Sequence, residues 1–589
     1  MRTTTEGGDV GTMRWIEDNV YDPKFGFWSR ANVGEVLPDP PSPLGWDMVF
    51  EGGTVLGWRD CMVKRLGIGD GEVHPSRPEV IGVFGGYAYL GISLLRIWAA
   101  RTPGFTPEAL DAAYFAGNPD IPPYVAEPWH ENQATTAVMA GWLGWVMGDK
   151  NQDELEADRV AARQVRADRP DLSTMTDLEL SERAASLKPF VRSLFDQHIN
   201  QSGAASIAPG ILGAVCAAIG NPTAAMRLLA GIGGVDSAEP SSVMWELSRT
   251  VRASAELTSH FDSGTDGLTD RLHADPSPSV AAFVTELDHF LVEFGSRGPN
   301  EWDIHSHTWE TQPDLVLAAI DRMRGADDSA APSGHHAAAE AERLRLGDEI
   351  AGMLAGTPET QGQFLAALAS ASVFLAGRER SKTNIIRVVH EIRLSVWEIG
   401  RRAAERGELD HARDVCMLFS DELHELAAGT LVGARELAAE RREHLDWLGT
   451  LEPPFLFDAP PPSNTTWPAR GANQPPFAGI GEVLAGLPGC PGVARGRARI
   501  VLHPSDPTAL EPGDVLVAPM TDPAWTPLFV AAGAVVVNVG APLSHAIIVS
   551  RELGIPCVVS VNQATARIPD GALVEVNGDT GTVTVLEPA

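Results

Sequence analysis

The chain has 589 residues, and its 78 acidic against 45 basic side chains give a formal net charge of −33, which argues against nucleic acid and anionic membranes as partners. Hydrophobic residues make up 44% of the sequence, which is enough for several packed domains. The five cysteines are scattered without a CxxC pair, and the N-terminus lacks the basic region and apolar core of a signal peptide. We therefore expect a soluble, cytoplasmic protein with reduced thiols.

A flexible tail is predicted over residues 1–12, ahead of a mainly helical body over residues 13–451. The body opens on an aromatic stretch that is rich in proline, so it is extended or looped rather than helical. Its polar members are Arg30, Asn32 and Glu35. Taken by itself, this stretch is typical of irregular structure that covers a core.

Helical patterns dominate the middle of the body. Residues 153–167 have the charge pattern of an amphipathic helix. Thr176 and Glu179 form a capping box, which predicts that a second helix starts there. Residues 204–220 are almost wholly small and apolar, which suits a buried helix.

Two groups of polar residues in the body are expected at its surface. His335 and His336 lie in an Ala- and Ser-rich stretch without nearby cysteine or carboxylate ligands, so solvent exposure is expected rather than a metal. A long helix is predicted over residues 378–408. Near its start lie Glu379, Lys382, Arg387, His390 and Arg393, and most of these are more typical of solvated or salt-bridged side chains than of catalytic ones.

A charged motif, GSRGPNEWD, lies at residues 295–303. Arg297 offers a fork of donors suited to a phosphoryl oxygen, and Glu301 and Asp303 are able to bind Mg²⁺ or to act as a base. The alternative is a buried arginine–carboxylate network that fixes a loop, and the residues slightly favour it. No metal site is predicted.

A proline-rich stretch at residues 452–478 is the clearest linker in the chain. It precedes a terminal domain of strands and turns, predicted over residues 479–589. Thr521 follows a strand predicted over residues 513–519. Open α/β sheets bind ligands at the carboxyl ends of their strands, so Thr521 is a candidate phosphate contact, against the alternative of turn capping.

The strongest chemical signal is a strand–loop–helix–strand unit around His545. The β-branched residues of 535–539 predict a buried strand, Gly540 breaks it, and Ser544 is a plausible N-cap for a helix to about Leu553. His545 then lies in the first turn, where unpaired backbone N–H groups favour an anion. A neutral imidazole there is a nucleophile beside a phosphate site. The alternative is a surface histidine that caps the helix.

These residues also match a longer pattern, which comprises Gly540, Ser544, His545, Ala546, Val549, Arg551, Glu552, Gly554, Ile555, Pro556 and Val558. The pattern resembles that of the swivelling phosphohistidine domain of phosphoenolpyruvate (PEP)-utilising enzymes, such as phosphoenolpyruvate synthase, pyruvate phosphate dikinase and rifampin phosphotransferase. Residues 28–46 and 295–309 are similar to the central parts of rifampin-phosphotransferase-like proteins. The resemblance implies a multidomain protein, with a mainly α body followed by a small α/β (β/β/α) swivelling domain.

The resemblance also implies roles for individual residues. His545 would be transiently phosphorylated, and the phosphate-binding candidates are Gly540, Ser544, Thr521 and Arg551. The candidates for a cleft that binds the acceptor are Arg30, Asn32, Glu35, Arg297, Glu301 and Asp303. Leu543 departs from the pattern, because many relatives carry threonine or methionine there, and this departure could alter phosphoryl transfer.

The source of the phosphoryl group is expected on another protein. Related proteins charge the histidine with an ATP-grasp domain, which is not recognisable in this chain, and a GxxxxGK[ST] loop is absent from the sequence. A separate ATP-grasp partner that binds ATP and Mg²⁺ is therefore expected, an arrangement similar to phenylphosphate synthase. The acceptor is expected to be a hydroxyl group of a small hydrophobic or aromatic molecule.

A non-catalytic function is the alternative to the proposed phosphotransferase. The chain would then be a non-catalytic phosphocarrier or regulatory protein, whose helical body binds a ligand without transferring phosphate. The fate of a phosphoryl label on His545 distinguishes the two.

Overall fold

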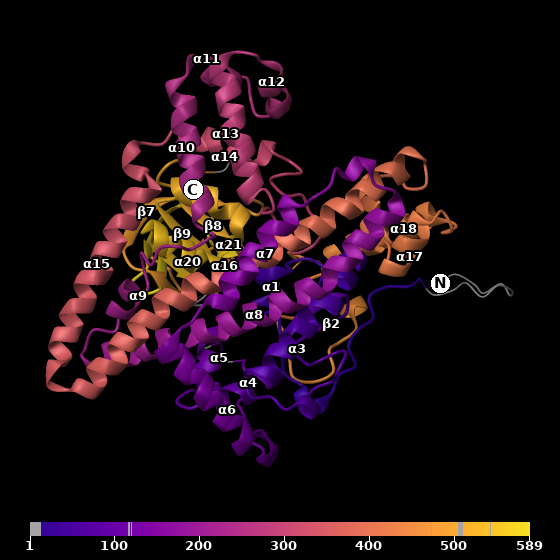
Figure 1. Ribbon diagram of the computed structural model, residues 1–589. Coiled ribbons are helices and arrows are strands. Elements are labelled where there is room, and N and C mark those ends of the chain that lie inside the picture. The colour runs from indigo at the N-terminus through magenta and orange to yellow at the C-terminus, as the bar shows by residue number, and fades with distance from the viewer. Residues whose placement is uncertain (1–12, 116–117, 119, 473, 505–509, 542–543) are drawn as a thin grey trace.

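A large helical body carries a small α/β domain at its C-terminal end in the computed structural model, which describes residues 13–115, 118, 120–472, 474–504, 510–541 and 544–589 (Figure 1). This confirms the fold class expected from the sequence. The predicted tail at residues 1–12 and the departure from the family pattern at Leu543 lie outside the described residues.

Two long helices form the spine of the body: α8 (Asp177–Ala218) and α16 (Pro358–Glu405). They run antiparallel, since Arg402 near the end of α16 forms a 2.9 Å ion pair with Asp177 at the start of α8. One stretch of α8 is long and apolar enough to cross a membrane by length and composition alone. In this fold α8 lies along α16 inside the body, so its apolar residues have protein neighbours (Figure 1).

The predicted helix starts agree with the structure where the local signal is strong. Helix α7 (Asp153–Ala167) covers the predicted residues, and α8 follows the predicted capping box, in which Thr176 Oγ1 accepts the N–H of Glu179. Helix α16 differs, because it begins at Pro358 rather than near Arg378. Buried residues such as Phe364, Ala371 and Phe374 continue its apolar face before Arg378. This first part of the helix was missed because it has few charged residues to mark its solvent-facing side.

Short helices and a small antiparallel sheet precede the spine. The helices are α1 (Val33–Val36), α2 (Pro43–Gly45), η2 (Trp46–Thr54), α3 (Val55–Lys64), α4 (Ile92–Arg101), α5 (Pro107–Phe115) and α6 (Gln133–Gly144). The sheet has the order β2-β3-β1-β4, with β1 (Trp28–Ser29), β2 (Ile81–Phe84), β3 (Tyr87–Gly91) and β4 (Leu456–Phe457). Most of the aromatic stretch is part of the core rather than a cover over it, and the short helices α1 and α2 within it correct the expectation of extended or looped chain.

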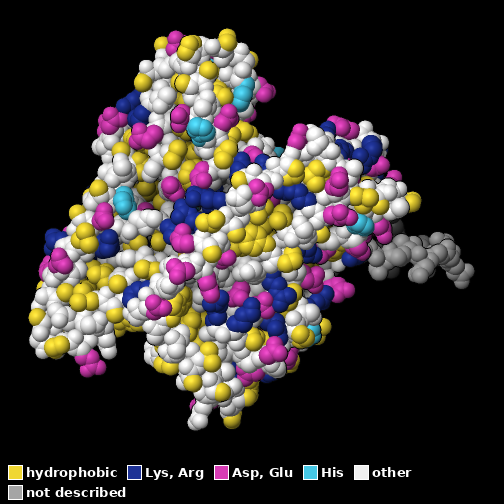
Figure 2. Space-filling model, in the orientation of Figure 1, with side chains coloured by type: hydrophobic (Ala, Val, Ile, Leu, Met, Phe, Trp, Pro, Cys, Tyr) yellow, Lys and Arg dark blue, Asp and Glu magenta, His cyan; other side chains and the backbone are white. Residues whose placement is uncertain are grey.

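The remaining helices form an arm beside the spine and a pair at its far end (Figure 1). The arm consists of α9 (Ala224–Leu228), α10 (Glu239–Ala253), α11 (Ala255–Asp262), α12 (Leu268–Ala274), α13 (Pro278–Phe294), α14 (Asp314–Arg324) and α15 (Pro332–Met353). The pair consists of α17 (Ser420–Ala427) and α18 (Ala434–Gly449). Acidic and basic side chains are interspersed over the face shown in Figure 2, so the net charge is not gathered into one patch there.

Much of the proline-rich stretch lies on the body. Strand β4 pairs with β1, and Trp467 is buried against the ring of Tyr87. Arg470 Nη1 donates to Asp39 Oδ1 at 2.8 Å. The described residues of 471–477 are mostly exposed, and they lead to the C-terminal domain. The free part of this connection is therefore shorter than its composition indicates.

The C-terminal domain is built on one mixed sheet with the order β5-β12-β11-β7-β8-β9-β10-β6. Strands β7 to β10 are parallel to one another, and the other pairs are antiparallel. The strands are β5 (Val483–Ala485), β6 (Leu487–Cys490), β7 (Val493–Ile500), β8 (Val515–Ala518), β9 (Ala534–Val537), β10 (Cys557–Val559), β11 (Leu573–Asn577) and β12 (Thr582–Glu587). The helices are α19 (Thr526–Ala531), α20 (His545–Leu553) and α21 (Ala564–Arg567).

Side-chain alternation explains how this domain has a core of its own and also packs on the body. On β9, Ala534 and Val536 belong to the core inside the domain, whereas Val535 and Val537 belong to a core shared with α10, α13 and α14. Both faces of the strand are thus covered, which is why its sequence is a continuous β-branched run.

Candidate active site

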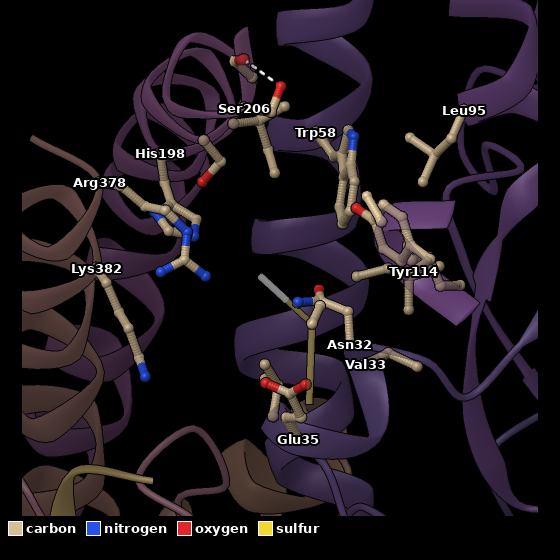
Figure 3. A pocket seen from close by; sticks show the side chains of 18 of the residues that line it. Asn32, Val33, Glu35, Trp58, Leu95, Tyr114, His198, Ser206, Arg378 and Lys382 are labelled. Atoms are coloured by element: carbon tan, nitrogen blue, oxygen red, sulfur yellow. Dashed lines mark hydrogen bonds between the residues drawn. The ribbon is translucent and has the colours of Figure 1, made fainter. Parts of the chain in front are cut away.

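A cavity of about 460 Å³ lies between the body and the C-terminal domain (Figure 3). The body contributes walls from α1, α3, α4, α5, α8 and α16. The C-terminal domain contributes Thr521 and Asp522 after β8, and Ala541 and His545 after β9. The cavity therefore lies at the carboxyl ends of two parallel strands, where open α/β sheets place their ligands.

Most of the cavity wall is apolar. Its large side chains are Phe50, Trp58, Met62, Leu66, Ile81, Leu90, Leu95, Trp98, Phe105, Leu110, Tyr114, Phe195, Ile199 and Trp302. Helix α8 contributes Gly203, Ser206, Pro209 and Gly210, whose small side chains leave space beside the helix. A wall of this kind, at this volume, suits a small organic molecule.

Polar side chains gather at the other end of the cavity. Figure 3 shows Asn32 and Glu35 on one side, and Arg378 and Lys382 across the open space from them. His545 lies at this same end. The cavity thus offers one apolar compartment and one charged compartment.

His545 is the first residue of α20, and its ring is held on both edges. Nε2 lies 3.1 Å from Thr526 Oγ1, and Nδ1 lies 3.3 Å from Thr521 Oγ1. Phe529 packs edge-on against the ring. Thr526 is fully buried, whereas Thr521 lines the cavity, so the edge of the imidazole beside Thr521 is the one turned toward the cavity.

The surroundings of His545 keep its imidazole neutral. Burial holds the pKa of His545 well below its usual value, and the charges of Lys382, Arg297 and Arg378 lower this pKa further. A histidine in such a place carries a free lone pair at physiological pH, because the charged form loses its hydration and meets like charges. The ring is therefore suited to nucleophilic attack.

The same cations are placed to stabilise an anion on His545. Arg378 and Lys382 line the cavity, and Arg297 lies behind them in a 2.9 Å ion pair with Glu301. The side chain of Ser544 makes no capping hydrogen bond at the start of α20. The Ser544 side chain therefore does not occupy the backbone N–H groups of the first turn, and these groups are able to donate to a phosphoryl oxygen.

The aromatic stretch brings two of its three polar residues to the cavity. Asn32 and Glu35 line it. Arg30 instead donates to the carbonyl oxygens of Ala88 and Leu37, each at 2.9 Å. Arg30 therefore fixes the loop that carries the other two.

The motif at residues 295–303 forms a buried network behind the cavity. Arg297 Nη1 donates to Thr383 Oγ1 at 2.8 Å, in addition to its ion pair with Glu301. Asp303 accepts hydrogen bonds from the backbone N–H of Ser42 at 2.8 Å and from its hydroxyl at 2.6 Å. Arg297, Glu301 and Asp303 are absent from the described cavity wall, and their contacts are those of a loop-fixing network.

The other phosphate-binding candidates have different surroundings. A Cβ at Gly540 would lie 2.8 Å from Val559 Cβ, so only glycine fits there. Ser544 is buried, and its Oγ has no hydrogen-bond partner among the described residues. Arg551 is buried and donates to the carbonyl oxygen of Gly489 at 2.9 Å, which ties α20 to β6.

Three residues of the polar end were not predicted as site residues. Lys382 was expected to be solvated or salt-bridged, and its Nζ does lie 3.5 Å from Glu301 Oε1, but together with Arg378 it also lines the cavity. Their spacing of four on one helix, which puts both on the same face, was the available signal. His198 of α8 also lines the cavity, and its Nδ1 lies 2.9 Å from Ser381 Oγ. A lone histidine in a long helix carried no such signal.

Two protein-family models match parts of the chain. The model of the mobile domain of PEP-utilising enzymes matches residues 510–581, which include His545. The chain carries this mobile domain. A second model, the fourth domain of rifampicin phosphotransferase, matches residues 194–379, which include His198 and Arg378. Together they confirm the family expected from the sequence, and they include His545 on one side of the cavity and His198 and Arg378 on the other.

The proteins to which this chain is similar carry different names. An uncharacterized protein of Mycobacterium tuberculosis is 31% identical over 369 residues, which cover 62% of this chain and 39% of the relative. A rifampicin phosphotransferase of Streptomyces sviceus is 29% identical over 378 residues, covering 62% of this chain and 42% of the relative. The prodigiosin synthesizing transferase PigC of Serratia marcescens is 26% identical over 601 residues, covering 95% and 63%. The chain spans about two fifths of the length of the first two, so its activity does not follow from their names alone.

Polar contacts hold the mobile domain on the body. Asp522 Oδ2 accepts the backbone N–H of Asn300 at 3.1 Å, beside the cavity. On another side of the domain, Glu552 Oε1 accepts the backbone N–H of Ile232 at 3.0 Å, and Glu552 Oε2 lies 3.0 Å from His336 Nδ1. The prediction of a solvated His336 was therefore wrong, because the mobile domain covers part of this side chain.

The His336–Glu552 contact predicts that docking of the mobile domain depends on pH. The hydrogen bond to Glu552 raises the pKa of His336. Because the folded pKa is raised, the contribution of the ion pair is complete below about pH 6.5, the ordinary value of histidine, and is lost as the pH rises through the folded pKa. We expect faster proteolysis within residues 471–477 at pH 8.5 than at pH 6.

His336→Ala should remove this difference in proteolysis, whereas His289→Ala, at an exposed position on α13, should keep it. His336 is still about one third exposed, so the ion pair contributes on the order of 1 kcal/mol and the expected change in the cleavage rate is a few-fold. A wild-type rate that does not change with pH would contradict the assignment.

Proposed function

We propose that this chain is a phosphotransferase component in which His545 takes a phosphoryl group and passes it to a hydroxyl group of a small acceptor bound in the cavity. The observation that carries the proposal is the position of a neutral, buried histidine at the charged end of an otherwise apolar cavity. The family models support it, since they match the mobile domain and the opposite wall.

The transfer step follows from the surroundings of His545. The acceptor oxygen attacks phosphorus, the P–N bond to the imidazole breaks, and an O–P bond forms. A proton kept on the other ring nitrogen makes the leaving group a neutral imidazole. Arg378 and Lys382 stabilise the negative charge on the phosphoryl oxygens during transfer.

The acceptor that fits this cavity is small and largely hydrophobic or aromatic. Its apolar part would lie among Trp58, Trp98 and Phe195, and its hydroxyl group would reach the polar end. Shape and burial supply the affinity in such a pocket, and a few polar groups orient the molecule.

The donor in this proposal is a separate ATP-grasp protein, which binds ATP and Mg²⁺. In the docked position His545 is buried, so the mobile domain must leave the body to be charged. The proposed division is a body at residues 13–451, a linker at residues 452–478 and the mobile domain at residues 479–589. Of that linker, residues 471–477 are the part without extensive contacts with the body, and they reach at most ~25 Å when extended.

A labelling experiment tests the proposal. The full chain is charged with ³²P-phosphoramidate, a small chemical donor, and hydroxylated aromatic compounds are then screened for discharge. We expect acid-labile label on the protein and its transfer to phenolic acceptors. A protein that takes no label would overturn the proposal. A label that leaves for none of the compounds would favour the non-catalytic phosphocarrier instead.

A further inference from the structure

Resting on the proposed function, we propose that Glu35 is the general base that takes the proton of the acceptor hydroxyl as the phosphoryl group leaves His545. Glu35 would then be a catalytic residue of the body, whereas the phosphorylated His545 belongs to the mobile domain. The step is complete only when both are docked.

The position of Glu35 meets the geometric demands on a base. It belongs to the short helix α1 and lies on the cavity wall across from Arg378 and Lys382 (Figure 3). The carboxylate lies close enough to the backbone N–H of Ala541, in the loop that leads to His545, for this N–H to lower its pKa. Its Oε1 is buried and has no hydrogen-bond partner among the described residues. Glu35 therefore lies next to the loop that carries His545, and Oε1 is free to accept a proton.

The other carboxylates at this end are less suited to the task. Asp522 already accepts the N–H groups of Asn300 and Ala524, one on each oxygen. Glu379 is paired with Arg378, and the neighbouring cations help to hold its pKa below the usual value despite burial. Both are committed to protein partners, and Glu379 is in addition a weak base.

His198 is the remaining candidate on the cavity wall. Burial, together with Arg378 and Lys382, holds its pKa well below the ordinary value, so it is a weak base. Its Nδ1 is also engaged with the hydroxyl of Ser381. Glu35 is thus the best-placed proton acceptor among the described cavity residues.

The environment of Glu35 gives it a suitable basicity. Burial raises its pKa to about 7, against the lowering effects of Arg378, the Ala541 N–H and Lys382. A base is most effective when its pKa is near the working pH, and such catalysis contributes roughly 10²- to 10⁴-fold in rate. Because the mobile domain forms one wall of the cavity, docking itself creates this burial.

The proton balance of the step is simple. The acceptor O–H bond breaks, its proton moves to the Glu35 carboxylate, and the oxygen forms the new bond to phosphorus. The P–N electron pair returns to the imidazole of His545. Glu35 later releases the proton to water when the mobile domain leaves.

Two probes with different acidities test the role of Glu35. Full-length protein charged with ³²P-phosphoramidate is mixed at pH 8.5 with phenol, which is still protonated, or with 4-nitrophenol, which is then almost wholly ionised. We expect Glu35→Gln to take up the same amount of label as wild type. We expect its discharge to phenol to fall by about 100-fold or more, and its discharge to the nitrophenolate to change only a few-fold.

The pH profile supplies the second readout. Wild-type discharge to phenol should decline as the pH falls through about 7, because the protonated carboxyl accepts no proton, whereas Glu35→Gln should show no such step. Glu108→Gln, at an exposed position in the first turn of α5, is the matched control. Equal losses with both probes, or an unchanged rate with phenol, would overturn the role of Glu35. Wild-type protein that keeps its label with both probes would instead refute the proposed transfer.

Discussion

His545→Ala should carry no acid-labile phosphate after treatment with phosphoramidate or with an ATP-dependent donor. The imidazole of His545 is the neutral nucleophile of the site, held between Thr521 and Thr526, and alanine leaves no atom able to form the P–N bond. The expected loss is complete, both for label uptake and for transfer to an acceptor. Uptake is measured from ³²P bound to protein, which should be acid-labile and base-stable.

The control for this variant is another histidine of the same domain. The chain has 16 histidines, so non-specific labelling must be separated from labelling of the site. His503 is exposed in the mobile domain, and His503→Ala should take up the wild-type amount. Equal labelling of wild type and His545→Ala would place the phosphoryl group elsewhere and remove the basis of the proposed relay.

The region around His545 was predictable because its signals are local. A β-branched run, a glycine and an N-capping residue each act within a few positions, and the structure has β9, Gly540 and α20 there. Even so, Ser544 makes no side-chain cap. Its hydroxyl is left without a partner among the described residues, which a pattern of residue types does not reveal.

The cavity was not predictable in the same way. Trp58, Tyr114 and His198 come from α3, α5 and α8, and each is an ordinary core residue in its own segment. Only the packing of these helices brings them to one wall. Phe25 and Phe27, two aromatic residues of the proline-rich stretch near the N-terminus, are instead buried in the core of the body.

The proline-rich stretch shows the limit of composition. Its prolines correctly indicate extended chain, but composition does not reveal what that chain touches. The hydroxyl of Tyr89 donates to the carbonyl oxygen of Pro454 at 2.9 Å, and that of Tyr87 donates to Leu448 at 2.7 Å. Within the stretch itself, Pro454 is held by Tyr89, and the carbonyl oxygen of Asp458 accepts the hydroxyl of Tyr21 at 2.7 Å. A stretch that resembles a free tether is therefore partly fixed to the body by residues far away in the sequence.

Lys382→Met and Arg378→Met should each slow the discharge of phosphorylated His545 by about 10²- to 10³-fold, the usual cost of removing one group that stabilises charge in the transition state. Both side chains line the cavity, and both act on the imidazole through their charge. Arg401→Gln, at an exposed position farther along α16, should leave the rate unchanged. Discharge is measured in a single turnover from pre-labelled protein.

An NMR titration of His545 in the unlabelled, docked protein separates this electrostatic role from a loss of structure. In the wild type, burial and the cations lower the pKa of His545, so its imidazole stays neutral below about pH 6.5, the ordinary pKa of a histidine. Removing Lys382 removes one of these charges, which raises the pKa of His545, so the imidazole should become protonated at a higher pH than in the wild type. A slower variant with an unchanged pH profile would mean that Lys382 acts by packing rather than by charge.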